Sequence, residues 1–172
     1  ETIQKRYNID VYNCTLDQVK AALKENKLEV EKTENKARGI DKLWKKVRKD
    51  VVGPVWLINT PAFISPLSKV SDNNSNYVQR FQAVIMGSEL ANGWSELNDP
   101  VDQLGRFLEQ QKMRDSGDDE AQMLDIDYVE MLEYGMPPAC GLGFSERVFW
   151  MFEGVTAREG VIFPQLRSDV DA

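Results

Sequence analysis

Apolar positions with helical spacing occupy the first fifty residues and return beyond residue 99. Thr15 and Gln18 have the spacing of a capping box, and an apolar face follows them. A second helical stripe covers residues 37–51. Asp99-Pro100 is typical of a helix start, because a capping carboxylate precedes a proline that suits the first helical position. A further helix is predicted over 126–134, before a glycine.

The middle of the chain follows the period of two that is typical of strands. We expect strands over 55–58 and 77–86, separated by a polar loop at 71–76. Residues 87–99 would pair with the second of these strands, and the glycine-rich segment 141–144 would form another. Strands mixed with helices, with neighbouring strands antiparallel, predict a single α+β domain.

The most polar of these strand segments is Gly87-Ser-Glu-Leu-Ala-Asn-Gly-Trp-Ser-Glu-Leu-Asn-Asp. It places Glu89, Asn92 and Glu96 among apolar residues, and buried polar groups need partners. Because no Lys or Arg is near in the sequence, we expect an external cation, either a metal ion, an ammonium group or both. The alternative interpretation is a solvent-exposed strand edge.

The position of each polar residue along this strand constrains how they could meet. On a regular strand Asn92, Trp94 and Glu96 face one way and Glu89 faces the other. A common site therefore requires a bulge or kink between residues 89 and 92. Trp94 would share that site or serve simply as a core aromatic.

A second candidate site is Gly141-Leu-Gly-Phe-Ser-Glu-Arg. Glycines on a strand allow a flat ligand or another backbone to come close. We expect Ser145 to cap a helix whose start favours an anion, with Arg147 in its first turn, where a cation opposes the helix dipole. Arg158 and Arg167 are further candidates for phosphate contact. The alternative is that the glycines serve packing and that Arg147 pairs with Glu146 or Glu133.

Composition narrows the chemistry. The 172 residues carry a net charge of −7, which disfavours a broad nucleic-acid surface and binding to DNA. The absence of histidine excludes histidine bases and ligands, so a metal would be held by oxygens and magnesium is the natural candidate. Cys14 and Cys140 suggest no disulfide framework and fit the cytoplasm. No signal peptide or membrane span is predicted.

Several long segments together resemble the carboxy-terminal part of the catalytic domain of class II lysyl-tRNA synthetases. The similarity is strong over 57–167 and weaker over 1–56. The matching segments are Ile64-Ser-Pro-Leu, Glu89-Leu-Ala-Asn-Gly-Trp-Ser-Glu-Leu-Asn-Asp-Pro, Ser116-Gly-Asp-Asp-Glu-Ala, Asp127-Tyr-Val-Glu-Met-Leu-Glu-Tyr-Gly-Met-Pro-Pro and Arg158-Glu-Gly-Val-Ile-Phe-Pro.

The resemblance implies an antiparallel sheet flanked by helices, with residues 1–54 as a helical, insertion-like region and 55–172 as the sheet with the family's third motif. It implies that the parent enzyme activates L-lysine with ATP and transfers it to tRNA(Lys), as a cytoplasmic homodimer. The two other readings are a relative that transfers lysine to a protein and a non-catalytic binding or assembly module.

The resemblance also implies residue roles. Glu89 would help hold Mg²⁺ near the phosphates of ATP, and Asn92 would position the amino acid or the reacting groups. Glu96 would pair with the side-chain ammonium of lysine. Arg147, in the third motif with Gly143, would contact ATP.

Three departures from the family pattern stand out. The alternating glycines of the third motif are cut short, which brings the strand-to-helix geometry into question. Gln82 stands where a second metal-binding glutamate is common, so a second Mg²⁺ should bind weakly. The second motif and its phosphate-binding arginine are missing, so residues 1–172 alone are expected to be inactive.

Overall fold

The computed structural model describes residues 1–32 and 35–164. Its first part is a helical region in which the two longer helices follow from the sequence pattern. The Thr15 side chain accepts a hydrogen bond from the backbone N–H of Gln18, and the Gln18 side-chain oxygen accepts one from the backbone N–H of Thr15, so the predicted capping box is present. The elements of this region are α1 (Thr2–Tyr7), α2 (Leu16–Glu25), α3 (Lys36–Val47) and the short 3₁₀ turn η1 (Arg48–Asp50).

The helical region closes its own core. Val19, Leu23 and Leu43 are completely buried between α2 and α3. Gly39 allows this close packing, because a Cβ atom added there would lie 2.3 Å from Cγ1 of Val19. Burial of apolar side chains at this density stabilises the three helices as one unit.

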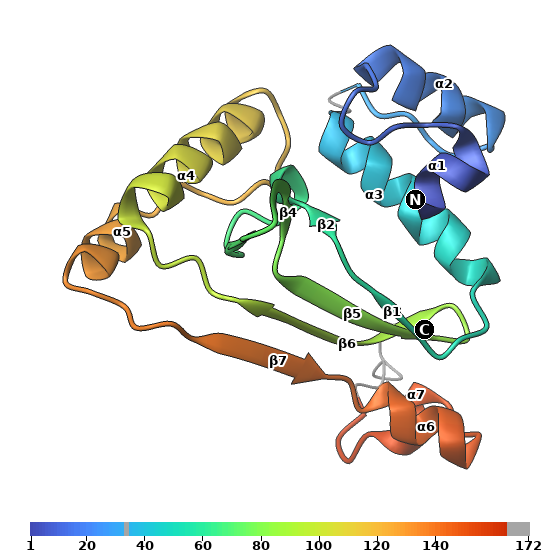
Figure 1. Ribbon diagram of the computed structural model, residues 1–172. Coiled ribbons are helices and arrows are strands. Elements are labelled where there is room, and N and C mark those ends of the chain that lie inside the picture. The colour runs from blue at the N-terminus through green and yellow to red at the C-terminus, as the bar shows by residue number, and fades with distance from the viewer. Residues whose placement is uncertain (33–34, 165–172) are drawn as a thin grey trace, which may run out of the picture.

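The main sheet has four antiparallel strands in the order β1-β5-β6-β7, and Figure 1 shows β7 at its outer edge. A small second sheet has the order β2-β4-β3; the 3₁₀ turn η2 (Ala62–Ile64) lies between β2 and β3, and β4 continues into β5 of the main sheet. The strands are β1 (Val55–Leu57), β2 (Thr60–Pro61), β3 (Val70–Ser71), β4 (Asn74–Val78), β5 (Arg80–Ile85), β6 (Ser88–Ser95) and β7 (Cys140–Phe144).

The remaining helices lie at the two ends of β7 (Figure 1). Asp99 caps α4 by accepting from the backbone N–H groups of Val101 and Asp102, as the Asp-Pro pair predicted. The α+β class is confirmed. These helices are α4 (Pro100–Asp115), α5 (Ile126–Glu133), α6 (Arg147–Glu153) and α7 (Ala157–Gly160).

Two local predictions were wrong, and two short helices were not predicted. The strand expected over 77–86 is two strands, β4 and β5, which belong to different sheets and meet at Gln79. Residues 74–76, expected in a loop, form the exposed start of β4, because an exposed hairpin strand tolerates polar residues on both faces. The helices α1 and α7 were not predicted; they are six and four residues long, too short for a clear period. Within the described residues, no helix is long and apolar enough to cross a bilayer.

Candidate active site

A bulge in β6 places the predicted site residues on one face of the main sheet. Gln82 pairs with Asn92, and the register then shifts so that Val84 pairs with Glu89. Residues directly opposite each other on antiparallel strands project to the same face. Glu89 therefore shares a face with Asn92, and the register break expected between residues 89 and 92 is confirmed.

Arg80 connects several groups on this polar face, although the sequence analysis did not single it out. Its Nε donates to Oδ1 of Asn92 at 2.9 Å, and its Nη1 donates to Oγ of Ser65 at 3.1 Å. Its guanidinium lies 5.7 Å from the ring centroid of Trp94. Burial lowers the pKa of Arg80 from its ordinary value, while the negative charge of Glu89 opposes that shift.

The contact with Arg80 fixes how Asn92 can meet a ligand. Arginine is only a donor, so the amide of Asn92 must turn its oxygen toward the guanidinium. The two N–H donors of the amide are then left for another group. Asn92 is consequently suited to an acceptor, such as a carboxylate or phosphate oxygen.

Glu96 is oriented by its neighbour on the same strand. Nε1 of Trp94 donates to Oε2 of Glu96 at 3.0 Å. The other oxygen, Oε1, lies 3.9 Å from where a Cβ atom of Gly141 would be. In the part of the chain that the structure describes, Trp94 is the one hydrogen-bond partner of this carboxylate. One oxygen thus remains for a donor or a cation.

Glu89 has a cationic partner, contrary to the expectation from the sequence. Nη1 of Arg48, which lies in η1, is 3.3 Å from Oε2 of Glu89. The two residues are 41 positions apart, so the local sequence could not reveal the pair. Arg48 supplies part of the positive charge that was assigned to an external cation.

The residues available to a magnesium ion are few. Glu89 offers one carboxylate and the buried Gln82 one neutral amide, on the same sheet face. The described residues contain no group of three acidic, cysteine or histidine side chains that could hold a metal. Such a set fits Mg²⁺ only where phosphate oxygens and water complete the octahedron, which is how Mg²⁺ is commonly bound beside nucleotides.

The glycines of β7 leave the polar face open beside Asn92 and Glu96. Gly143 pairs with Asn92 and Gly141 with Trp94, and an added Cβ at either glycine would meet nothing closer than 3.9 Å. By contrast, a Cβ at Gly93, on the opposite face, would lie 2.8 Å from the ring of Phe81. Packing within the described chain therefore explains Gly93 but not the two glycines of β7.

Arg147 lies just beyond this strand, at the start of α6. Despite the shortened glycine series, the strand leads to the helix through two residues, and the N–H of Ser145 bonds to the carbonyl of Leu90 at 2.7 Å. The cap is Glu146 and not Ser145, whose Oγ instead accepts from the N–H of Arg147 at 3.3 Å. Among the described residues, Arg147 has no ion pair and is exposed. Arg158 is also exposed, and Arg167 lies outside the described residues.

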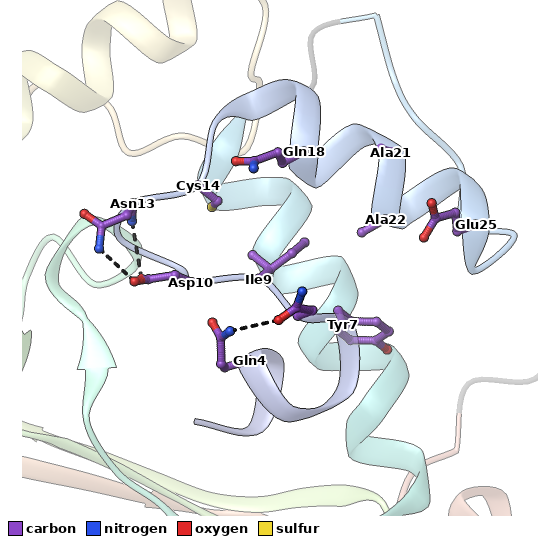
Figure 2. Close-up of a pocket in the computed structure, with 11 residues that line it drawn as sticks. Gln4, Tyr7, Ile9, Asp10, Asn13, Cys14, Gln18, Ala21, Ala22 and Glu25 are labelled. Atoms are coloured by element: carbon purple, nitrogen blue, oxygen red, sulfur yellow. Dashed lines mark hydrogen bonds between the residues drawn. The ribbon is translucent and has the colours of Figure 1, made fainter.

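A separate cavity of about 560 Å³ lies in the helical region, far in the chain from the polar face (Figure 2). Its polar side chains bond to one another: Gln4 donates to Asn8, and Asn13 donates to Asp10. Burial raises the pKa of the Cys14 thiol, which keeps it protonated and unreactive. This cavity therefore offers little to a reacting substrate.

The antiparallel sheet with its polar face and glycine-lined edge strand defines a class II synthetase catalytic fold. The family model described as "tRNA synthetases class II (D, K and N)" matches residues 3–167, and the chain belongs to this family.

Curated relatives point to one branch of the family. The chain is 42% identical over 167 residues to a lysine–tRNA ligase of Thermosipho africanus, covering 96% of this chain and 33% of the relative. It is 42% identical over 164 residues to that of Thermotoga maritima, covering 94% and 32%. It is 45% identical over 118 residues to that of Aromatoleum aromaticum, covering 67% and 24%. The chain thus spans about a third of the length of the first two relatives.

Proposed function

We propose that the full-length protein containing this chain is a lysine–tRNA ligase, which activates L-lysine with ATP and transfers it to tRNA(Lys). The observation that carries the proposal is the orientation of two groups on β6. Glu96 keeps one carboxylate oxygen for a cation, while Asn92 keeps amide donors for an acceptor. The names of the relatives support the same substrates.

These two groups suit opposite ends of lysine. The carboxylate of Glu96 pairs with the side-chain ammonium, and the amide of Asn92 donates to the carboxylate end or to the phosphate being attacked. A neutral or acidic side chain in that position would leave the part-buried carboxylate of Glu96 without a cation to balance its charge, which disfavours such a substrate. Selection of lysine therefore rests on the charge of one carboxylate.

We place the ATP-binding site at the edge of the main sheet. The exposed guanidinium of Arg147 neutralises phosphate charge, and Gly143 leaves the strand flat enough for a ligand to approach. Glu89 would hold a single Mg²⁺, with Gln82 as a weak neutral ligand. When bound, Mg²⁺ supplies further neutralisation of phosphate charge, in addition to that of Arg48.

The reaction requires positioning more than a reactive side chain. The lysine carboxylate displaces pyrophosphate from the α-phosphorus of ATP, and a hydroxyl of the terminal ribose of the tRNA then attacks the acyl carbon of the adenylate, which forms the ester and releases AMP. Asn92, held by Arg80, keeps the attacking carboxylate in place. The same proposal includes a homodimer working in the cytoplasm, and the two free cysteines fit a reducing compartment.

Glu96→Gln in the full-length protein tests the proposal. Removing one member of a desolvated ion pair costs about 2–5 kcal/mol, so the KM for lysine should rise by about 30-fold or more, with the KM for ATP little changed. Glu130→Gln, an exposed carboxylate on α5, is the matched control. Lysine-dependent pyrophosphate exchange measures activation, and charging of tRNA against labelling of protein identifies the acceptor. Wild-type lysine kinetics in Glu96→Gln would contradict the assignment.

A further inference from the structure

The loop between η2 and β3 carries two buried serines beside the candidate active site. The hydroxyls of Ser65 and Ser68 are hydrogen-bonded to each other at 2.7 Å, and both residues are almost completely buried. We call residues 65–68 the serine loop. Ser68 forms an isolated antiparallel bridge with Glu96, so the serine loop lies against the chain where β6 ends.

Two side chains of α4 also hold the serine loop. Gln103, which is fully buried, donates from Nε2 to the carbonyl of Pro66 at 3.3 Å. Arg106 donates from Nη1 to the carbonyl of Ser68 at 2.8 Å, and its charge is balanced by Asp102, one turn earlier on the helix. Because a loop lacks a regular ladder of backbone hydrogen bonds, such contacts satisfy its carbonyl groups and fix its position.

The serine loop reaches the candidate active site through one hydrogen bond. Nη1 of Arg80 donates to Oγ of Ser65 at 3.1 Å, while Nε of the same guanidinium donates to Oδ1 of Asn92 at 2.9 Å. Across residues 1–32 and 35–164, these two neutral oxygens are the only hydrogen-bond acceptors of Arg80, which has no ion pair there. The guanidinium is a rigid planar fork, so the Ser65 hydroxyl also sets the direction in which Nε meets Asn92.

Loss of the Ser65 hydroxyl would release this guanidinium. Nη1 would keep its charge but lose its acceptor in a part-buried position, which is unfavourable. Glu89 offers a carboxylate on the same face of the sheet, and the guanidinium would turn toward it. The amide of Asn92 would then no longer have to direct its oxygen at Arg80, so its N–H donors would lose their fixed direction.

We propose that Ser65 is a positioning residue for the lysine carboxylate and acts through Arg80 on the amide of Asn92. The inference rests on the proposed function, because it takes Asn92 as the group that donates to this carboxylate. It gives the serine loop and α4 a part in the reaction, although neither is assigned to substrate contact. Ser68 and Arg106 hold the hydroxyl and the loop in place behind Ser65.

The test compares two ligands that carry the same two amines. Lysine has a carboxylate, and 1,5-diaminopentane lacks it. In full-length Ser65→Ala, the KM for lysine in pyrophosphate exchange should rise by about tenfold, because the carboxylate loses an oriented hydrogen bond. The inhibition constant of the diamine should stay at the wild-type value, since Glu96 still pairs with its ammonium group. A general loss of structure would weaken both ligands and could not separate them.

Three further variants complete the experiment. Ser75→Ala, the same change at an exposed serine of β4, is the matched control and should leave both constants unchanged. Ser65→Thr keeps a hydroxyl and should restore most of the affinity for lysine. Ser68→Ala retains Ser65 but removes the hydroxyl bonded to it, and should raise the KM for lysine by less than Ser65→Ala does. Thermal unfolding shows which variants are folded, and Ser68→Ala decides the question if Ser65→Ala is not.

Equal weakening of lysine and the diamine would overturn the inference, because the serines would then support the pocket as a whole. Lysine kinetics that are unchanged in both serine variants would overturn it as well. In both cases lysine-dependent exchange by the wild type would leave the proposed function standing. Absence of that exchange in the wild type would overturn the proposed function and this inference together.

Discussion

The helical region and the main sheet differ in how far their side chains are buried and hydrogen-bonded. In the helical region Val19, Leu23 and Leu43 are completely buried, and polar side chains around its cavity bond to one another. In the sheet, polar groups are held in place but keep an open oxygen or N–H, and the opposite face exposes Leu142 and Phe144 by 67% and 61%. The first arrangement maximises stability, whereas the second keeps surfaces available for binding.

Because of this contrast, substitutions in the two regions should have different effects. A side chain in the closed core contributes through packing and should change the stability of the protein without altering substrate constants. A side chain on the polar face contributes by orienting groups that bind substrate. Its substitution should change substrate constants with little effect on stability. In the full-length protein, variants of the two regions should therefore separate a loss of stability from a loss of substrate binding.

Leu43→Ala should destabilise the protein by about 2–5 kcal/mol, because Leu43 is completely buried and its loss leaves a cavity. The KM values for lysine and ATP should stay near those of the wild type. Denaturant unfolding measures the first effect and pyrophosphate exchange the second. Leu142→Ala, the same change at an exposed site, should cost less than about 0.5 kcal/mol. Equal losses in the two variants would remove the contrast between the regions.

Arg147→Ala should lower kcat/KM for ATP by about tenfold to a hundredfold, since it removes an exposed cation assigned to phosphate. The melting temperature should hold or rise slightly, because a cation in the first turn of α6 opposes the helix dipole. Steady-state kinetics and thermal unfolding give the two readouts. A clear loss of stability with ATP kinetics intact would mean that Arg147 is structural.

Trp94→Phe should raise the KM for lysine by about tenfold, because Glu96 loses the N–H that holds its carboxylate. The KM for ATP should change much less. Pyrophosphate exchange at varied lysine and varied ATP separates these constants. If both rise equally, Trp94 supports the sheet as a whole and does not orient Glu96.

Asp118→Asn should lower stability near neutral pH by about 1–2 kcal/mol. Arg38 and Asn35 bond to this carboxylate, with Nη2 of Arg38 at 2.8 Å from its Oδ1, and these bonds hold the pKa of Asp118 below its usual range. A lowered pKa stabilises the fold above the unfolded value of about 3.9, and this contribution is lost as pH falls through the folded value. The difference in the free energy of unfolding between wild type and variant should therefore disappear below about pH 4. Urea unfolding at a series of pH values measures this difference. A difference in stability that does not depend on pH would show that the charge of Asp118 is not its cause.

The sequence predicted features that short segments encode. The capping pair of Thr15 and Gln18 and the Asp99-Pro100 start act within one helical turn, and both are present. The bulge before Asn92 could be predicted because Glu89 and Asn92 are an odd number of positions apart. On a regular strand they would lie on opposite faces, so only a bulge lets them share one site.

The sequence did not predict contacts that the fold brings together from distant positions. The pair of Arg48 and Glu89 joins a 3₁₀ turn to a strand, and no local pattern links them. The role of Arg80 was missed because only pairing with β6 sets it beside Asn92 and Trp94. The division between β4 and β5 was missed because both strands continue one alternating pattern.

The bulge at Leu90 has a consequence for how this segment can change over generations. Glu89 and Asn92 are an odd number of positions apart, so they share a face only while Leu90 stays out of the regular pairing. If the strand paired regularly over its present length, Glu89 would turn toward the opposite face although every site residue was retained. Deletion of Leu90, by contrast, would leave the two residues two positions apart, on one face of a regular strand, so the site depends on the backbone conformation at Leu90 as well as on its side chains.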